Sequence, residues 1–108
     1  MILETINAND VKEKTASGVS VVLFSKEICP FCKTMKKVLG KVQAGPNVRI
    51  MEIDGVLHRP VAEEHKVARL PTIVFFKDGQ EGARVMGVVN AAHLQKILDP
   101  LVRAQNKG

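Results

Sequence analysis

The chain has 108 residues, 45% of them hydrophobic and 25% charged, a composition typical of one domain with a buried core. Sixteen Lys and Arg against eleven Asp and Glu give a net charge of +5, but four Phe and no Trp or Tyr offer few rings for base stacking, which argues against nucleic-acid binding. No apolar stretch nears the ~20 residues of a membrane-spanning helix, so we expect no membrane partner. No signal peptide is recognisable, so we expect a cytoplasmic protein. We also expect residues 1–108 to form a single, monomeric domain.

Local patterns predict alternating strands and helices along the chain. Strands are indicated by short runs rich in β-branched or aromatic residues, and helices by apolar residues three or four positions apart. In chain order we expect a strand at 2–5, a helix from Asn7 or Asn9 to Thr15, a strand at 19–25, a helix at 30–44, a strand at 48–54, a helix opened by Pro60, strands at 73–76 and 83–86, and a helix from Asn90 to Leu101.

The connections between these elements predict how the strands pair. Helices between the earlier strands require crossovers and favour parallel pairing, whereas the tight turn at Asp78-Gly79 predicts an antiparallel hairpin. Gly40 weakens its helix by about 1 kcal/mol relative to Ala, so we expect a bend there. Together these features predict an α/β fold, a mixed central β-sheet flanked by helices on both faces.

The two cysteines lie where the strand at 19–25 gives way to the next helix. Pro30 suits the first turn of that helix, because its fixed φ is helical and its missing N–H is not needed there. Cys29 therefore precedes a helix N-terminus, where unpaired N–H groups and the helix dipole favour a thiolate. This placement favours redox chemistry in which Cys29 is the attacking thiolate and Cys32 the resolving thiol.

Three other interpretations of the cysteine pair remain. A structural disulfide closing so short a loop would remove little entropy from the unfolded chain. A zinc site would need two further ligands, but the chain has no second CxxC, and His58 and His65 are seven residues apart. Two inert buried thiols would leave the proline and the helix start unexplained. We therefore expect no metal.

Four motifs together resemble the thioredoxin family, and the similarity runs over nearly the whole chain. The first is the CxxC pair beside a βαβ pattern. Leu70-Pro71-Thr72 resembles the family's loop, whose proline is cis and lies beside the active-site sulfurs. The segment 74–79 resembles the strand and turn that follow, and 85–88 resembles the glycine segment beside the substrate groove.

The resemblance implies a thioredoxin fold and a protein-disulfide reductase that cycles between a Cys29/Cys32 dithiol and disulfide without a bound cofactor. It implies a cis bond before Pro71, next to which a substrate strand would pair with the backbone of Leu70. Electrons would come from an NADPH-dependent reductase or from glutathione. The residues expected to bind substrate are Ile28, Pro30, Phe31, Leu70, Pro71, Gly87 and Val88.

The chain also departs from the thioredoxin pattern. Its Cys-Pro-Phe-Cys order is more similar to glutaredoxins, so a glutathione-dependent oxidoreductase is the first alternative, although the segment after Met86 lacks their Gly-Gly-Asp-like pattern. Leu23 stands where thioredoxins have a buried acid, and Ile50 where they have a lysine. Cys32 must then lose its proton to water or to another base, such as Glu27. A non-catalytic binding module and a metal-binding domain are the remaining alternatives.

Overall fold

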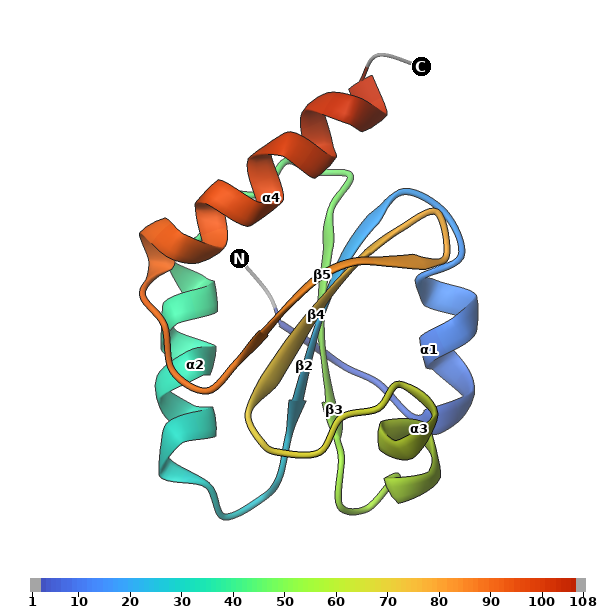
Figure 1. The fold of residues 1–108 in the computed structure, drawn as a ribbon, viewed down its shortest axis with the longest axis vertical. Helices are drawn as coiled ribbons and strands as arrows, with labels where there is room; N and C mark the ends of the chain where they lie inside the picture. The colour runs from blue at the N-terminus through green and yellow to red at the C-terminus, as the bar shows by residue number, and fades with distance from the viewer. Residues whose placement is uncertain (1–2, 107–108) are drawn as a thin grey trace.

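The computed structural model describes residues 3–106, which contain one mixed sheet and helices on both of its faces. The predicted order of elements is confirmed, while residue 2 of the predicted first strand lies outside the described residues. The elements are β1 Glu4–Thr5, α1 Ala8–Lys14, β2 Val19–Ser25, α2 Pro30–Gly40, β3 Arg49–Asp54, α3 Arg59–Glu64, β4 Thr72–Lys77, β5 Gln80–Met86 and α4 Ala91–Asn106 (Figure 1).

The sheet has the strand order β1-β3-β2-β4-β5. Strand β3 pairs in parallel with both β1 and β2, as crossover helices require, whereas β4 is antiparallel to β2 and to β5. Asp78 and Gly79 turn the β4–β5 hairpin with φ values of 50° and 84°. Figure 1 shows α2 and α4 on one face of the sheet and α1 and α3 on the other. The predicted α/β architecture is therefore confirmed.

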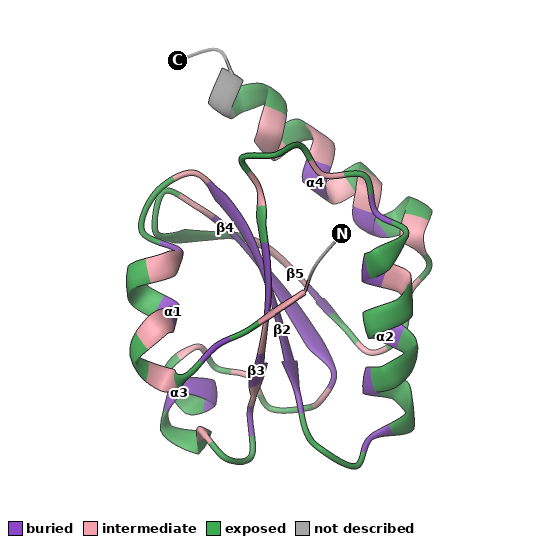
Figure 2. Cartoon of the chain, turned by 180° about the vertical axis from the view of Figure 1, so that it is seen from behind, coloured by how far each residue is buried: buried purple, intermediate pink, exposed green. Residues whose placement is uncertain are grey.

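Strand β2 lies in the middle of the sheet and is buried along its whole length (Figure 2). Because successive side chains of a strand point to opposite faces, this one run supplies both halves of the core. Leu23 packs in the cluster beneath α2 and α4, and Phe24 packs in the cluster beneath α1 and α3. Burial on both faces explains why the strand is a continuous apolar run rather than an alternating one.

Three predicted boundaries are wrong by three residues or more. Helix α4 continues through Pro100 to Asn106 instead of ending at Leu101. Helix α2 ends at Gly40 and not at residue 44, because the N–H groups of Lys41 and Val42 bond to carbonyls only three residues back, which closes the last turn. Gly40 is thus the end of the helix and not a bend within it. Strand β5 begins at Gln80 rather than at Ala83, since an edge strand that is largely exposed needs few apolar residues.

Candidate active site

Cys29 caps the N-terminus of α2, at the end of the sheet where the parallel strands β2 and β3 also end. Its backbone is extended, with φ −157° and ψ 100°, and Pro30 occupies the first turn. Proline has no N–H, and the N–H of Cys32 instead donates a hydrogen bond of 3.2 Å to the Sγ atom of Cys29. The sulfur therefore takes the place of the oxygen of an ordinary N-cap side chain.

The two cysteines form a disulfide, and their Cα atoms are 5.2 Å apart. Cys29 is 5% exposed and Cys32 is 1% exposed, so the residue at the helix end is the more exposed of two buried cysteines. When the disulfide is reduced, the N–H of Cys32 and the positive end of the α2 dipole both stabilise negative charge on Cys29. The geometry thus favours Cys29 over Cys32 as the sulfur that carries negative charge.

The loop before β4 forms a cleft of about 430 Å³ close to the cysteines. The bond between Leu70 and Pro71 is cis, as predicted, and Gly87 has φ +82°, a conformation that strains any residue with a Cβ atom. The N–H of Gly87 donates to the carbonyl of Pro71 over 2.9 Å, which joins the β5 end to this loop. The residues that line the cleft are Phe31, Arg69, Leu70, Pro71, Gly87 and Val88.

Five of the seven residues expected to bind substrate therefore line one cleft, although substrate binding itself stays a prediction. Ile28 and Pro30 are exposed at the same end of the molecule, and Ile28 is the most exposed large apolar residue among residues 3–106, at 85%, but neither lines the cleft. Three further large apolar side chains are exposed in the described structure and were not predicted: Val56, Leu57 and Met86.

Arg69 is the residue of this cleft that sequence reasoning missed. Its carbonyl accepts a hydrogen bond of 2.7 Å from the Oγ1 atom of Thr72, so the backbone from which its side chain leaves is fixed. Arg69 and Leu70 also line a second cleft, of about 370 Å³, which continues toward Val56 and Arg59. Its position directly before Leu70-Pro71 is the only signal in the sequence that could have identified it.

The sheet beneath α2 is apolar where thioredoxins carry their acid and lysine. Leu23 is fully buried and Ile50 is 5% exposed, and both belong to the core cluster beneath α2. The carboxylate of Glu52 lies further along β3, where its Oε2 atom accepts a hydrogen bond of 2.6 Å from Ser25 Oγ and forms an ion pair with Lys36 Nζ over 2.7 Å. The Glu52 side chain is 13% exposed and already paired.

A second charged contact holds the chain segment that leads into the cleft. The guanidinium of Arg84 on β5 donates to the carboxylate of Glu81 and to the carbonyls of His65 and Lys66, over 2.6 and 3.0 Å for the two carbonyls. This ion pair lowers the pKa of Glu81 and raises the pKa of Arg84. It anchors the end of α3 to β5 three residues before Arg69.

Residues 3–106 contain no group of three or more His, Cys, Asp or Glu side chains that could hold a metal ion. Within the same residues, no helix has the length and apolar character that crossing a membrane requires.

Comparison with known proteins agrees with this geometry. The family model for thioredoxin matches residues 3–100. The thioredoxins of Chlamydia trachomatis and Staphylococcus aureus are each 30% identical to this chain, over 90% and 92% of it and over 96% and 97% of their own lengths. The solution structure of reduced desulfothioredoxin from Desulfovibrio vulgaris Hildenborough, 28% identical, has a TM-score of 0.77 over 91% of this chain and 96% of its own. With its cysteine pair joined at a helix N-terminus, the chain belongs to the thioredoxin family and is a thiol–disulfide oxidoreductase.

Proposed function

We propose that the protein reduces disulfide bonds in other proteins, with Cys29 as the attacking thiolate and Cys32 as the resolving thiol. The observation that carries this assignment is the hydrogen bond from the Cys32 N–H to Cys29 Sγ at the start of α2. It gives Cys29 the stabilised negative charge that attack requires, and it leaves Cys32 within one turn of the sulfur it must later displace.

The reaction consists of two exchanges of sulfur partners. The Cys29 thiolate attacks one sulfur of the substrate disulfide, forming a mixed disulfide and releasing the other substrate sulfur as a thiolate, which takes up a proton. The Cys32 thiolate then attacks Cys29 Sγ and releases the second substrate thiolate. Two electrons pass to the substrate, and the Cys29–Cys32 disulfide remains, which is the state the structure describes.

The substrate segment would lie in extended form across the cleft and pair with the backbone of Leu70. The loop with the cis bond before Pro71 and the turn at Gly87 form one edge of the cleft, where backbone groups can pair with a substrate strand. The apolar side chains that line the cleft can pack against apolar residues of the substrate. We assign this docking role to Ile28, Pro30, Phe31, Leu70, Pro71, Gly87 and Val88.

Thioredoxins act on protein disulfides and take their electrons from a reductase, without a prosthetic group. We extend this to an NADPH-dependent reductase as the electron donor here, with glutathione as the alternative to be tested.

We also propose that residues 1–108 act as one monomeric domain in the cytoplasm. The family match over residues 3–100 supports the single domain, and a lone CxxC pair is typical of a redox catalyst in a reducing compartment.

Single cysteine variants test the two roles. Cys29→Ser should abolish turnover, because no attacking thiolate remains, whereas Cys32→Ser should accumulate a covalent complex with a disulfide-containing protein. Mass spectrometry of the complex, before and after reduction with dithiothreitol, identifies the sulfur that carries the partner. Stable complexes through Cys32 in the Cys29→Ser protein, with none through Cys29 in the other variant, would reverse the assignment.

A further inference from the structure

We propose that Arg69 makes the cleft selective for protein segments that carry an acidic side chain close to their disulfide-bonded cysteine. This inference rests on the proposed function, since it names the class of substrate that the same site would take. It concerns a residue outside the cysteine pair and outside the apolar residues to which docking has been assigned.

The position of Arg69 allows it to reach a bound segment. It directly precedes Leu70, whose backbone would pair with the substrate, and it is exposed and lines both the cleft beside Pro71 and the second cleft. Residues of an extended segment advance by about 3.3 Å each, so a side chain within three residues of the substrate cysteine lies within ~10 Å of it along the strand. A flexible arginine held at its backbone by Thr72 can cover part of that span.

The charge of Arg69 is available to a partner. Within residues 3–106, no carboxylate lies within ion-pair distance of Arg69, whereas Arg59 is bonded to Glu63 and Arg84 to Glu81. A guanidinium presents paired N–H donors whose geometry matches a carboxylate. The apolar side chains beside it would shield such a contact from water once a segment is bound, and this strengthens the attraction.

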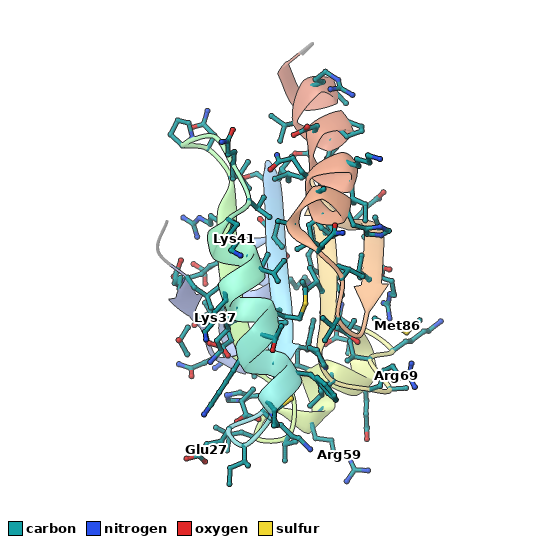
Figure 3. The ribbon with its side chains drawn as sticks, turned by 90° about the vertical axis from the view of Figure 1, so that its left-hand side faces the viewer. Glu27, Lys37, Lys41, Arg59, Arg69 and Met86 are labelled. Carbon is teal, nitrogen blue, oxygen red and sulfur yellow. A yellow bond between two sulfur atoms is a disulfide. The ribbon has the colours of Figure 1, made fainter. Side chains whose placement is uncertain are left out.

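The opposite side of the active-site end carries charges of both signs. Glu27, two residues before Cys29, is exposed, and Figure 3 shows Glu27 and Arg69 on opposite sides of this end of the molecule. Lys26 and Lys36 line the same hollow as Glu27 and offset its charge. Beside the cleft, by contrast, Arg69 is the charged residue of the lining, so an acidic side chain in the cleft would be attracted toward it.

A peptide series tests this selectivity. Each peptide carries one cysteine as a mixed disulfide with 2-thiopyridine, and one Glu, Gln or Lys at a single position within three residues of that cysteine. Release of 2-thiopyridone by the reduced protein gives the second-order rate constant for attack. The ratio of the Glu to the Lys peptide cancels the intrinsic reactivity of Cys29. Dividing it by the same ratio measured with dithiothreitol removes the peptides' own difference in reactivity toward a thiolate, so the normalised ratio isolates the contribution of the protein's charge.

We expect the wild-type chain to favour Glu over Lys by about three- to tenfold at one or more positions, and less in molar salt, which screens the contact. In Arg69→Gln the ratio should fall to about one, and in Arg69→Glu it should reverse. Arg103→Gln is the matched control, because it removes an exposed arginine near the C-terminal end of α4. Figure 1 shows this end of α4 at the opposite end of the molecule from the loop that precedes β4, so the variant should keep the wild-type ratio.

The outcomes separate the inference from the proposed function. Peptides that react with no preference in the wild-type chain, or with the same preference in Arg69→Gln, would overturn the role of Arg69 and leave disulfide reduction intact. If neither the peptides nor the neutral hydroxyethyl disulfide reacts with the reduced protein, the proposed function fails, and the inference fails with it.

Discussion

The role that we propose for Cys29 depends on its position on the backbone. The extended residue, the proline that follows it and the N–H of Cys32 together place a sulfur where a helix would otherwise have an oxygen cap. All three features are local, so the sequence was sufficient to predict that Cys29 directly precedes the N-terminus of α2. The cis bond before Pro71 was predicted from the resemblance to the thioredoxin family and not from local sequence. Arg69 has no local signal beyond its position directly before Leu70-Pro71, because the clefts that it lines are formed by segments distant in the sequence.

The contact among Ser25, Lys36 and Glu52 was also beyond sequence reasoning. Ser25 and Glu52 are 27 residues apart, and only the register of β2 against β3 together with the placement of α2 joins them. Leu23 and Ile50 could be recognised as departures from the thioredoxin pattern, because that comparison needs only the alignment of residues. The structure adds that both are packed in the core, so the site of the missing acid is closed.

Restoring an acid at position 23 should speed the second exchange. We expect Leu23→Asp to raise the rate constant of Cys32 attack by about tenfold or more at neutral pH, because a buried carboxylate can accept the thiol proton. Leu23→Asn is the matched control, since it is equally polar and of similar size but cannot take the proton. The rate follows from rapid mixing of the reduced protein with a peptide disulfide under single-turnover conditions.

Both substitutions should lower the free energy of unfolding by several kcal/mol, because each buries a polar group in an apolar core. The double variant Leu23→Asp/Ile50→Lys keeps the experiment decisive if the single variant unfolds, since it gives the carboxylate a partner. Equal rate constants for the acid-bearing variants and the Asn control would contradict the account.

At the scale of elements, the helix and strand ends needed contacts that sequence periodicity does not contain. The spacing of apolar residues predicted a helix that reaches residue 44. Val42 fits this spacing because it is buried, but it lies beyond the end of α2. The early start of β5 follows from pairing with β4 rather than from its own residues. The contact that Arg84 makes with α3 likewise arises between elements, and it supports the chain before the cleft.

Removing the Arg84 guanidinium should destabilise the fold in a pH-dependent way. We expect Arg84→Met to lower the free energy of unfolding by about 1–2 kcal/mol near neutral pH, measured by urea denaturation, since a charged donor to several acceptors is lost. The pKa of Glu81 is lower in the folded chain than in the unfolded chain, so its contribution is present above the unfolded pKa and is lost as pH falls through the folded one.

The cost of Arg84→Met should therefore shrink as the pH falls below the unfolded-state pKa of Glu81 and through its lower folded-state pKa, where the carboxylate takes up its proton. It should not vanish, because the two carbonyl contacts do not titrate. In a Glu81→Gln background the cost should no longer change with pH in this range. A cost that stays constant into acid in the wild-type background would contradict the contribution of Glu81.

At the scale of the molecule, the mixed sheet with a parallel part and an antiparallel hairpin could be predicted because pairing directions follow from the connections, whereas the strand order came from the structure. Helices between the first three strands require parallel pairing, and the Asp78-Gly79 turn requires a hairpin. The result places the carboxyl ends of β2 and β3 at one end of the sheet, where the cysteines and the cis-proline loop meet. The fold is that of thioredoxins, whereas the Cys-Pro-Phe-Cys sequence is similar to that of glutaredoxins. Because these two features indicate different electron donors, the donor has to be measured.

The most direct test of the whole account is the reduction of insulin disulfides, supplied in parallel by thioredoxin reductase with NADPH and by glutathione with glutathione reductase. We expect turnover with the first supply, absent in Cys29→Ser, and little with the second. Turnover with glutathione alone would show that the Cys-Pro-Phe-Cys sequence decides the donor. Absence of turnover in both, in a protein that mass spectrometry shows cannot cycle between dithiol and disulfide, would contradict the account as a whole.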